Sequence, residues 1–258
     1  MKLGISYNLW DGTELLKSSI LSVRNSVDFI SIIFQDESNF GKKKEGLQPL
    51  LSSLLKDKLI DEVYHYKTDL TLLPHQNELI KRNLGISLSR FNKCTHHLSI
   101  DVDEFYNNQF SQAKEYIEEN KINVSVCQMQ SYYKYPTLQI TPPEDYYVSF
   151  IFKVEPRTCF ILNQQYPVLV DTTRRVPVLG SFKMFGRDEL EMHHFSYVRK
   201  NIRQKLESST ANCNFVSDIE TLVNHYENFN EGDQALFAGN PCIYHHLQQV
   251  SNQFNITL

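Results

Sequence analysis

Two carboxylates one residue apart end a short apolar stretch, Ser99-Ile100-Asp101-Val102-Asp103. Side chains alternate along an extended chain, so Asp101 and Asp103 are predicted to share one side while Ile100 and Val102 point into the protein. Paired hard oxygen donors at a strand end suit Mg²⁺ or Mn²⁺ carrying a phosphorylated ligand, because open α/β sheets bind ligands at that end. A solvated acidic turn is the alternative interpretation.

Two earlier stretches carry polar groups that can join such a site. A predicted helix over residues 74–90 leads into the Asp101 strand, and an apolar stripe of Ile80, Leu84 and Leu88 would leave Arg82 off the core face. Gly85 on this helix is expected where backbones pack closely. Asp36 follows a predicted strand over residues 27–34 and can accept a base N–H or merely cap a turn.

A late segment, Glu191-Met192-His193-His194-Phe195-Ser196-Tyr197-Val198-Arg199, supplies imidazole and cationic groups. Adjacent histidines on a strand point to opposite faces, so at most one of them reaches a shared site. Arg199, Arg203 and Lys205 follow and can offset phosphate charge, although a basic helix can equally be a solvated face.

Strands alternating with helices predict an α/β fold with a mostly parallel sheet flanked by helices. We expect one domain over residues 1–258, with a nucleotide-binding half at 1–106 and a second half at 107–258 that extends the same domain. The predicted strands are 2–7, 27–34, 61–66, the stretch before Asp101, 122–128, 146–154, 158–162 and 191–197. The predicted helices are 14–24, 47–55, 74–90, 111–120, 199–207 and 216–226, with an irregular stretch up to 145 and loops and short strands at 166–186.

Composition excludes several classes of protein. The 258 residues are 41% hydrophobic and 22% charged, as in ordinary globular proteins, and the net charge of −4 provides no cationic field for nucleic acid. The five cysteines lack close pairing and predict reduced thiols in the cytoplasm. No stretch approaches the about 20 apolar residues that span a bilayer, so no transmembrane segment is expected, although peripheral membrane contact stays compatible.

The run Ile100-Asp101-Val102-Asp103-Glu104-Phe105-Tyr106 resembles the Asp-X-Asp signature of GT-A-fold glycosyltransferases. Arg82-Asn83-Leu84-Gly85, about twenty residues earlier, is similar to glycosyltransferase family 2. The segment around His194 and Arg199 resembles the His-Tyr-Arg type ending of metal-dependent GT-A enzymes. The resemblance spans roughly residues 1–205 in order, and it implies a GT-A (Rossmann-like) fold with a smaller acceptor-side region in the C-terminal half.

The resemblance also implies roles for individual residues. A nucleotide-sugar donor, with UDP as the nucleotide, would contact Asp36, Arg82, Asp101, Arg199, Arg203 and Lys205. Asp36 would receive the uracil ring, although the family usually has two adjacent aspartates where this chain has Asp36-Glu37. Mn²⁺ or Mg²⁺ would be held by Asp101, Asp103 and His194, with His193 in reserve.

The acceptor side is less defined by the sequence. Tyr132, Tyr133 and Tyr135 follow the strand after the metal loop and can cover a sugar face or pack the second half of the domain. An inverting enzyme needs a carboxylate base near the acceptor hydroxyl, and the candidates are Asp171, Asp188 and Glu191. A retaining enzyme needs no base there.

These features predict a metal-dependent glycosyltransferase of the hexosyltransferase type that moves a sugar onto a glycan or glycolipid acceptor, as in polysaccharide biosynthesis. One alternative is a phosphohydrolase of the haloacid dehalogenase type, but that family places Asp-X-Asp after its first strand. The other is a non-catalytic glycan-binding protein with the same fold. As an exposed metal ligand, Asp103 is expected to matter for activity and little for stability.

Overall fold

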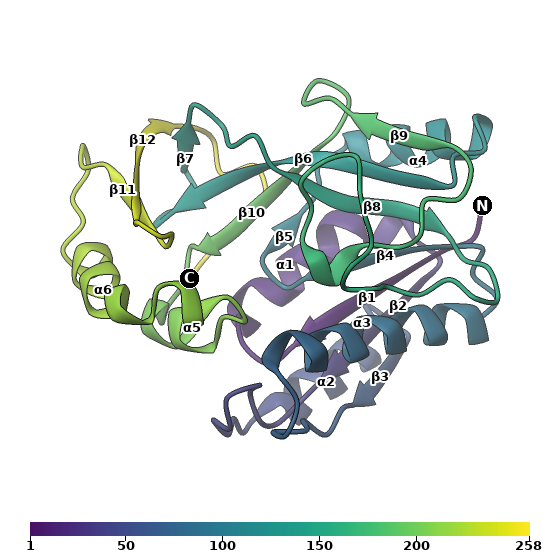
Figure 1. The fold of residues 1–258 in the computed structure, drawn as a ribbon, viewed down its shortest axis with the longest axis horizontal. Coiled ribbons are helices and arrows are strands. Elements are labelled where there is room, and N and C mark those ends of the chain that lie inside the picture. Colours follow the sequence, from purple (N-terminus) through teal and green to yellow (C-terminus); the bar gives the residue numbers. More distant parts are fainter.

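One twelve-stranded sheet organises the chain, and its main path runs in the order β11-β12-β7-β6-β8-β4-β1-β2-β3. The computed structural model describes residues 1–258. Helices lie on both sides of the sheet, and the two ends of the chain are well separated (Figure 1). The protein is therefore an α/β protein with helices flanking the sheet, as the sequence predicts, but the sheet as a whole is mixed and only its core strands are parallel.

The N-terminal half forms the parallel part of the sheet. Strands β3, β2, β1 and β4 run parallel to one another, so their carboxyl ends meet at one edge. Every helix and strand predicted before Asp101 is present, within a few residues. The elements are β1 (Leu3–Leu9), α1 (Thr13–Val23), β2 (Phe29–Phe34), α2 (Leu47–Lys56), β3 (Glu62–His65), α3 (Pro74–Phe91) and β4 (His96–Asp101).

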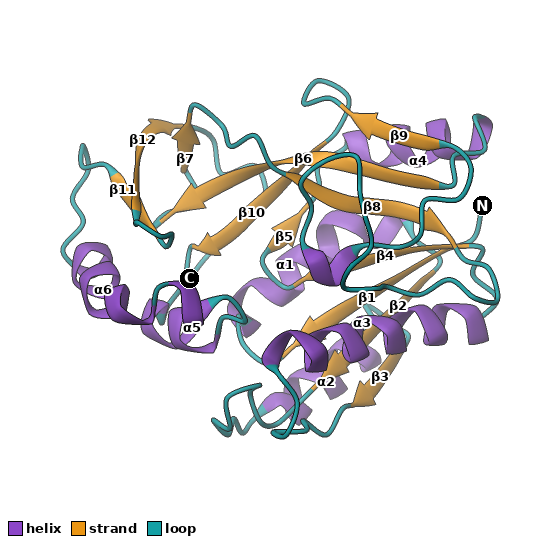
Figure 2. Ribbon diagram, viewed as in Figure 1, coloured by secondary structure: helices purple, strands orange, loops and turns teal.

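The second half extends the same sheet with mostly antiparallel strands. Strand β8 joins it to β4, and β10 runs parallel to β6 and pairs with the short β5 (Figure 2). The elements are β5 (Glu104–Phe105), α4 (Gln109–Glu119), β6 (Val124–Tyr133), β7 (Leu138–Thr141), β8 (Tyr147–Lys153), β9 (Phe182–Phe185), β10 (Glu191–Tyr197), α5 (Ile202–Ser208), α6 (Ile219–Glu227), β11 (Ala235–Phe237) and β12 (Ile243–Gln249). The predicted division of the domain into functional halves at residue 106 stays a prediction.

Some sequence predictions for this half are wrong. Residues 158–162 form no strand, because Phe160 exchanges hydrogen bonds with the Asn83 side chain of α3 instead of with a neighbouring strand. The stretch predicted as irregular contains the end of β6 and all of β7, in which Leu138 and Ile140 are buried in alternation. Strands β11 and β12 were not predicted, since β12 is mostly exposed and its alternation is correspondingly weak.

The parallel strands have one apolar face and one polar face. On β1, Leu3, Ile5, Tyr7 and Leu9 belong to the main core, together with buried residues of α1, α2 and α4. Ile100 and Val102 join the same core, which confirms the alternation predicted around Asp101 and Asp103. The opposite face of β1 carries Gly4, Ser6 and Asn8, and it lies under α3.

Helix α3 therefore packs through polar and small residues, which contradicts the predicted apolar stripe. Arg82 is fully buried, whereas Ile80 is 38% exposed. Arg82 donates to Ser99 Oγ at 3.0 Å on β4, and His97 bonds both Ser6 and Ser89. Because these groups satisfy one another, the helix can bury charge against the sheet.

Two predictions drawn from composition can be compared with the fold. All five cysteines are free thiols, and Cys94 and Cys127 are buried. None of the helices combines the length and hydropathy needed to cross a lipid bilayer.

Replacing Gly85 by alanine tests the close contact between α3 and β1. A methyl group there would lie 2.1 Å from Ser6 Oγ and 2.5 Å from Ser6 Cβ, so the helix must shift. We expect Gly85→Ala to lower the free energy of unfolding in urea by about 1–3 kcal/mol. In an exposed helix the same change would stabilise by about 1 kcal/mol, so a more stable variant would contradict this packing. Ser87→Ala, on the exposed side of α3, is the matched control.

Candidate active site

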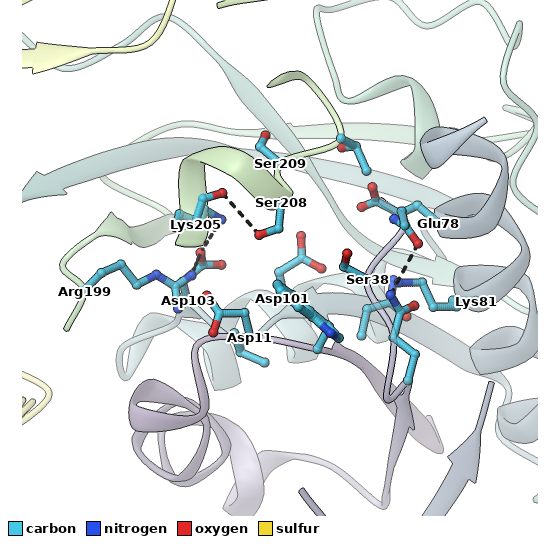
Figure 3. Close-up of a pocket in the computed structure, with 16 residues that line it drawn as sticks. Asp11, Ser38, Glu78, Lys81, Asp101, Asp103, Arg199, Lys205, Ser208 and Ser209 are labelled. Carbon is cyan, nitrogen blue, oxygen red and sulfur yellow. Dashed lines mark hydrogen bonds and ion pairs between the residues drawn. The ribbon is translucent and has the colours of Figure 1, made fainter. Parts of the chain in front are cut away.

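A polar cavity of about 170 Å³ opens where the parallel strands end. It lies between the turns after β1 and β2, the Asp-X-Asp loop after β4, helix α3 and helix α5 (Figure 3). Its lining residues are Asn8, Trp10, Asp11, Gln35, Ser38, Asn39, Glu78, Lys81, Asp101, Val102, Asp103, Arg199, Lys205, Ser208, Ser209 and Thr210. The site thus draws on segments from residue 8 to residue 210.

Asp103 lies on the α5 side of the cavity and is almost completely buried. Its Oδ2 accepts hydrogen bonds from Arg199 Nη2 and from Lys205 Nζ, the latter at 3.0 Å (Figure 3). Its backbone oxygen accepts from the Phe195 amide at 2.8 Å, so β10 is fixed to the loop. Neither Arg199 nor Lys205 has another carboxylate partner.

Asp101 lies towards α3 and is held by two buried arginines. Its Oδ2 accepts from Arg82 Nη2 at 3.1 Å and from Arg174 Nη2. Arg174 also pairs with Glu104 Oε1 at 2.7 Å, and Arg82 with Glu78. Arg82, which the resemblance places near the nucleotide, contacts Asp101 but is fully buried and does not line the cavity.

These ion pairs set the protonation states of the carboxylates. Burial alone would raise the pKa of Asp103, but Lys205, Arg199 and His194 outweigh it and hold that pKa well below its usual range. The pKa of Asp101 is lowered in the same way by Arg174 and Arg82. Glu104 differs: burial raises its pKa to about 6 despite the contact with Arg174. Both aspartates are therefore ionised at neutral pH.

The two adjacent histidines point in opposite directions, as predicted. His194 Nε2 lies 3.8 Å from Asp103 Oδ1, so His194 is the histidine that faces the loop. Burial lowers its pKa, which favours the neutral imidazole despite the nearby Asp103. His193 faces the other way and bonds the Tyr132 hydroxyl at 2.9 Å.

The end of the cavity formed by the turns after β1 and β2 was not predicted from the sequence. Four polar atoms there are buried without a hydrogen-bond partner: both amide atoms of Asn8, Trp10 Nε1 and Gln35 Oε1. Gln35 is only 1% exposed. Buried polar atoms are normally paired, so this cluster indicates a place for ligand groups. The alternation of Gly4, Ser6 and Asn8 with apolar neighbours was the available sequence signal.

Two cationic side chains in the cavity also have unused donors. Lys81 was not predicted; it is 5% exposed, and burial lowers its pKa to about 8, partly opposed by Glu78. Arg199 Nη1 is buried without a partner and lies over Gly12. Gly12 has φ of 74°, and a Cβ there would lie 1.9 Å from that nitrogen. Only glycine therefore leaves room for the Arg199 side chain in this position.

The structure places Asp36 and Arg203 outside the cavity. Asp36 is more than half exposed and pairs with His65 Nε2 at 2.9 Å, in a different hollow beside β3. The chain turns after Gln35, so Gln35 points into the cavity and its neighbour points out. Arg203 lies on the outer side of α5, where it pairs with Glu220.

None of the three candidate bases lines the cavity. Asp171 is the nearest to the charged cluster, since its Oδ2 lies 3.5 Å from Arg174 Nε and 3.9 Å from Arg82 Nη2. Asp188 is exposed in the turn between β9 and β10. Glu191 pairs with Arg187 at the start of β10.

Burial contradicts a cleft role for two of the three tyrosines. Tyr132 and Tyr133 are 2% and 0% exposed, because β6 continues through them into the core of the second half. Tyr133 packs among the aromatic rings of Tyr197, Tyr226 and Phe229. Tyr135 alone is exposed, and it lines a second cavity of about 460 Å³.

The predicted metal site requires donors that the chain does not bring together. No group of three or more His, Cys, Asp or Glu side chains is arranged in a way that could hold a metal ion. Asp103 offers only Oδ1 beside His194, while its other oxygen binds two cations. Arg199 and Lys205 both repel a cation that approaches Asp103, which offsets the attraction of its carboxylate. The residues present therefore do not fit a resident metal.

Comparisons with known proteins give only remote likenesses. No protein-family model matches the sequence, and no curated protein matches it. Among solved structures, a crystal structure of S. aureus TarS 1-349 has 10% identity and a TM-score of 0.47, over 80% of this chain and 63% of that one. A second S. aureus TarS structure has 10% identity and a TM-score of 0.45, over 80% of this chain and 38% of its own.

A third similar structure is a mannose-1-phosphate geranyltransferase from Thermus thermophilus. It has 12% identity and a TM-score of 0.31, over 60% of this chain and 51% of its own. This chain thus spans less than two thirds of the length of these proteins. With TM-scores below 0.5, the likenesses carry no weight for function.

Replacing Asp103 by asparagine tests the buried ion pairs. The change leaves Arg199 and Lys205 without their carboxylate, so we expect a loss of about 3 kcal/mol of unfolding free energy at pH 7. Asp103 is 1% exposed, so the expectation of an exposed ligand with little effect on stability is replaced by this one. Asp36→Asn, at an exposed aspartate, should change stability by less than about 0.5 kcal/mol.

The same variant has a predicted pH dependence. Because the folded-state pKa of Asp103 is depressed, its contribution is complete above the unfolded-state pKa of about 3.9 and decreases as the pH falls towards the folded value. The stability difference between wild type and Asp103→Asn should therefore shrink below about pH 4. A difference that stays constant in urea titrations from pH 7 to pH 3 would contradict the ion-pair assignment.

Proposed function

We propose that this protein is a glycosyltransferase that uses a nucleotide-diphosphate sugar, with UDP as the nucleotide. The observation that carries the proposal is the cavity itself, which combines unpartnered polar atoms of Asn8, Trp10 and Gln35 with cationic Arg199 and Lys205. It lies at the carboxyl edge of parallel strands, where α/β proteins bind nucleotides. The resemblance of the Asp-X-Asp run to glycosyltransferases supports the sugar part.

The proposed donor extends along the cavity with its base between the turns after β1 and β2. Uracil presents an imide N–H between two carbonyl oxygens, and the Asn8 amide can match one donor and one acceptor of that edge. Gln35 Oε1 and Trp10 Nε1 add an acceptor and a donor. Asn8 lies beside Asp101 in the strand register, so the ribose and diphosphate would continue towards Asp103.

In the proposed reaction the acceptor hydroxyl oxygen forms a bond to the sugar C1 while the bond from C1 to the diphosphate oxygen breaks. The acceptor proton leaves with a base or with solvent, and the leaving diphosphate gains one negative charge. Positively charged side chains near that oxygen stabilise the transition state, since its charge develops there. The Mn²⁺ or Mg²⁺ dependence that the Asp-X-Asp resemblance implies is not part of this proposal, because the chain brings no three metal-binding side chains together.

The second cavity is the proposed entrance for a glycan or glycolipid acceptor. It is lined by Lys134, Tyr135, Lys200 and Tyr226, and it shares Arg199 with the donor cavity. An exposed tyrosine beside cationic groups suits a sugar, whose faces are apolar and whose rim carries hydroxyl groups. Of the tyrosines expected to bind the acceptor, Tyr135 is the one that we propose for this role, because it lines this cavity.

Neither alternative function gains an observation in its favour. A haloacid dehalogenase-type hydrolase requires an Asp-X-Asp pair after the first strand, whereas β1 is followed only by the single Asp11, which pairs with Lys44. A glycan-binding protein without turnover would need no cationic groups with unused donors in the nucleotide cavity.

Incubation with a panel of nucleotide sugars tests the proposed function. We expect hydrolysis or transfer from at least one UDP-sugar, detected as released UDP, and no release of phosphate from p-nitrophenyl phosphate. Phosphate release without UDP release would support the hydrolase instead. Binding of free glycans without any nucleotide binding would support the glycan-binding protein.

Fluorescence of Trp10 provides a direct test of the base contacts, because it is the only tryptophan in the chain. We expect UDP to change its emission, and Asn8→Leu or Gln35→Leu to weaken UDP binding about tenfold, since each removes a hydrogen-bonding group from a buried edge. Asp36→Asn, outside the cavity, is the control and should bind UDP like wild type. If Asp36→Asn weakened UDP binding about tenfold and Asn8→Leu bound UDP like wild type, the base would lie elsewhere.

A further inference from the structure

We infer that cationic side chains of the chain itself, Lys81, Arg199 and Lys205, neutralise the donor diphosphate without a divalent metal. The inference rests on the proposed function, because it concerns how the same cavity holds a nucleotide diphosphate. It differs from what the Asp-X-Asp resemblance implies, in which a metal ion carries this charge. The distribution of charge around Asp103 supports it.

The charge around Asp103 has a positive surplus. Arg199 and Lys205 both contact Asp103 Oδ2, and neither shares another carboxylate. On the Asp101 side the surplus is negative, because Arg82 and Arg174 are shared among four carboxylates, Asp101, Glu78, Glu104 and Asp171. A divalent cation entering beside Asp103 would be repelled, whereas an anion would be attracted.

Three cationic groups still have donors available to an anion. Lys81 lines the cavity almost fully buried and forms no ion pair, and Arg199 Nη1 is buried without a partner. Lys205 uses one of its three ammonium hydrogens on Asp103 and is 29% exposed towards the cavity. Lys81 approaches from α3 and the other two from the α5 side, so they flank Asp101 and Asp103 (Figure 3).

The geometry also explains why the aspartates are present in a site without metal. Asp103 fixes Arg199 and Lys205 at the cavity wall before the donor arrives, and Gly12 leaves the space in which Arg199 lies. Asp101 is in turn fixed by Arg82 and Arg174. Preorganised donors need no rearrangement when charge develops on the leaving oxygen, which is the role a metal would otherwise fill.

Titration of UDP in excess EDTA and in Mn²⁺, followed by Trp10 fluorescence and calorimetry, tests the inference. We expect the same dissociation constant under both conditions. UMP should bind more weakly than UDP in EDTA, because it lacks the second phosphate. Lys205→Gln and Lys81→Gln should each weaken UDP binding in EDTA about tenfold to hundredfold, the loss of one charge-assisted contact.

Arg203→Gln is the matched control, since Arg203 lies on the same helix as Lys205 but pairs with Glu220 at the surface. It removes the same net charge and should bind UDP like wild type. Lys81→Gln removes a lysine without an ion pair, so its fold is expected to survive even if Lys205→Gln is unstable.

UDP binding that requires Mn²⁺, or that EDTA weakens about tenfold or more, overturns the inference and leaves the proposed function intact. Equal weakening by Arg203→Gln and Lys205→Gln also overturns it, because the effect would then be one of net charge. Absence of UDP binding under both conditions overturns the inference and the proposed function together.

Discussion

The buried ion pairs at the Asp-X-Asp loop are the interaction on which the rest of the structure depends. Asp101 and Asp103 lie beside each other, yet each is held by cations from different parts of the chain: Arg82 and Arg174 for one, Arg199 and Lys205 for the other. Asp103 and the three arginines are almost completely buried, and charges at that depth require partners. Helix α3, the turn after residue 171, strand β10 and helix α5 are all fixed in place partly by meeting this requirement.

The polar layer between α3 and the sheet extends this arrangement towards the ligand. Ser6, His97 and Ser89 satisfy one another, and Arg82 binds Ser99, so the layer is connected by hydrogen bonds beneath the cavity. Where the layer reaches the edge of the sheet the hydrogen bonds end, and Asn8, Trp10 and Gln35 are left with free atoms. The change from satisfied to unsatisfied polar groups marks where protein contacts stop and ligand contacts are proposed to begin.

The sequence predicted the parallel half of the fold because strong local patterns determine it. The alternation around Ile100 and Val102 and the opposite faces of His193 and His194 follow from strand geometry alone. The predictions from sequence failed where contacts with distant parts of the chain decide whether a side chain is buried. Ile80 is exposed and Arg82 is buried because Arg82 pairs with Asp101, a contact between α3 and β4 that no local pattern reveals. Asp36 turns outwards beside Gln35 because the chain bends there. Tyr132 and Tyr133 are buried because β6 continues further than its composition indicates.

The sequence separation of the contacts at Asp103 has a consequence for the order of folding. Its partners Arg199 and Lys205 are 96 and 102 positions away in the chain. Contacts of such long range form late, since the entropy of closing the intervening loop must be offset first. Until β10 and α5 dock, the Asp-X-Asp loop carries an unpartnered negative charge that favours water over burial. A partly folded chain therefore lacks the paired cations on which the proposed diphosphate contact depends.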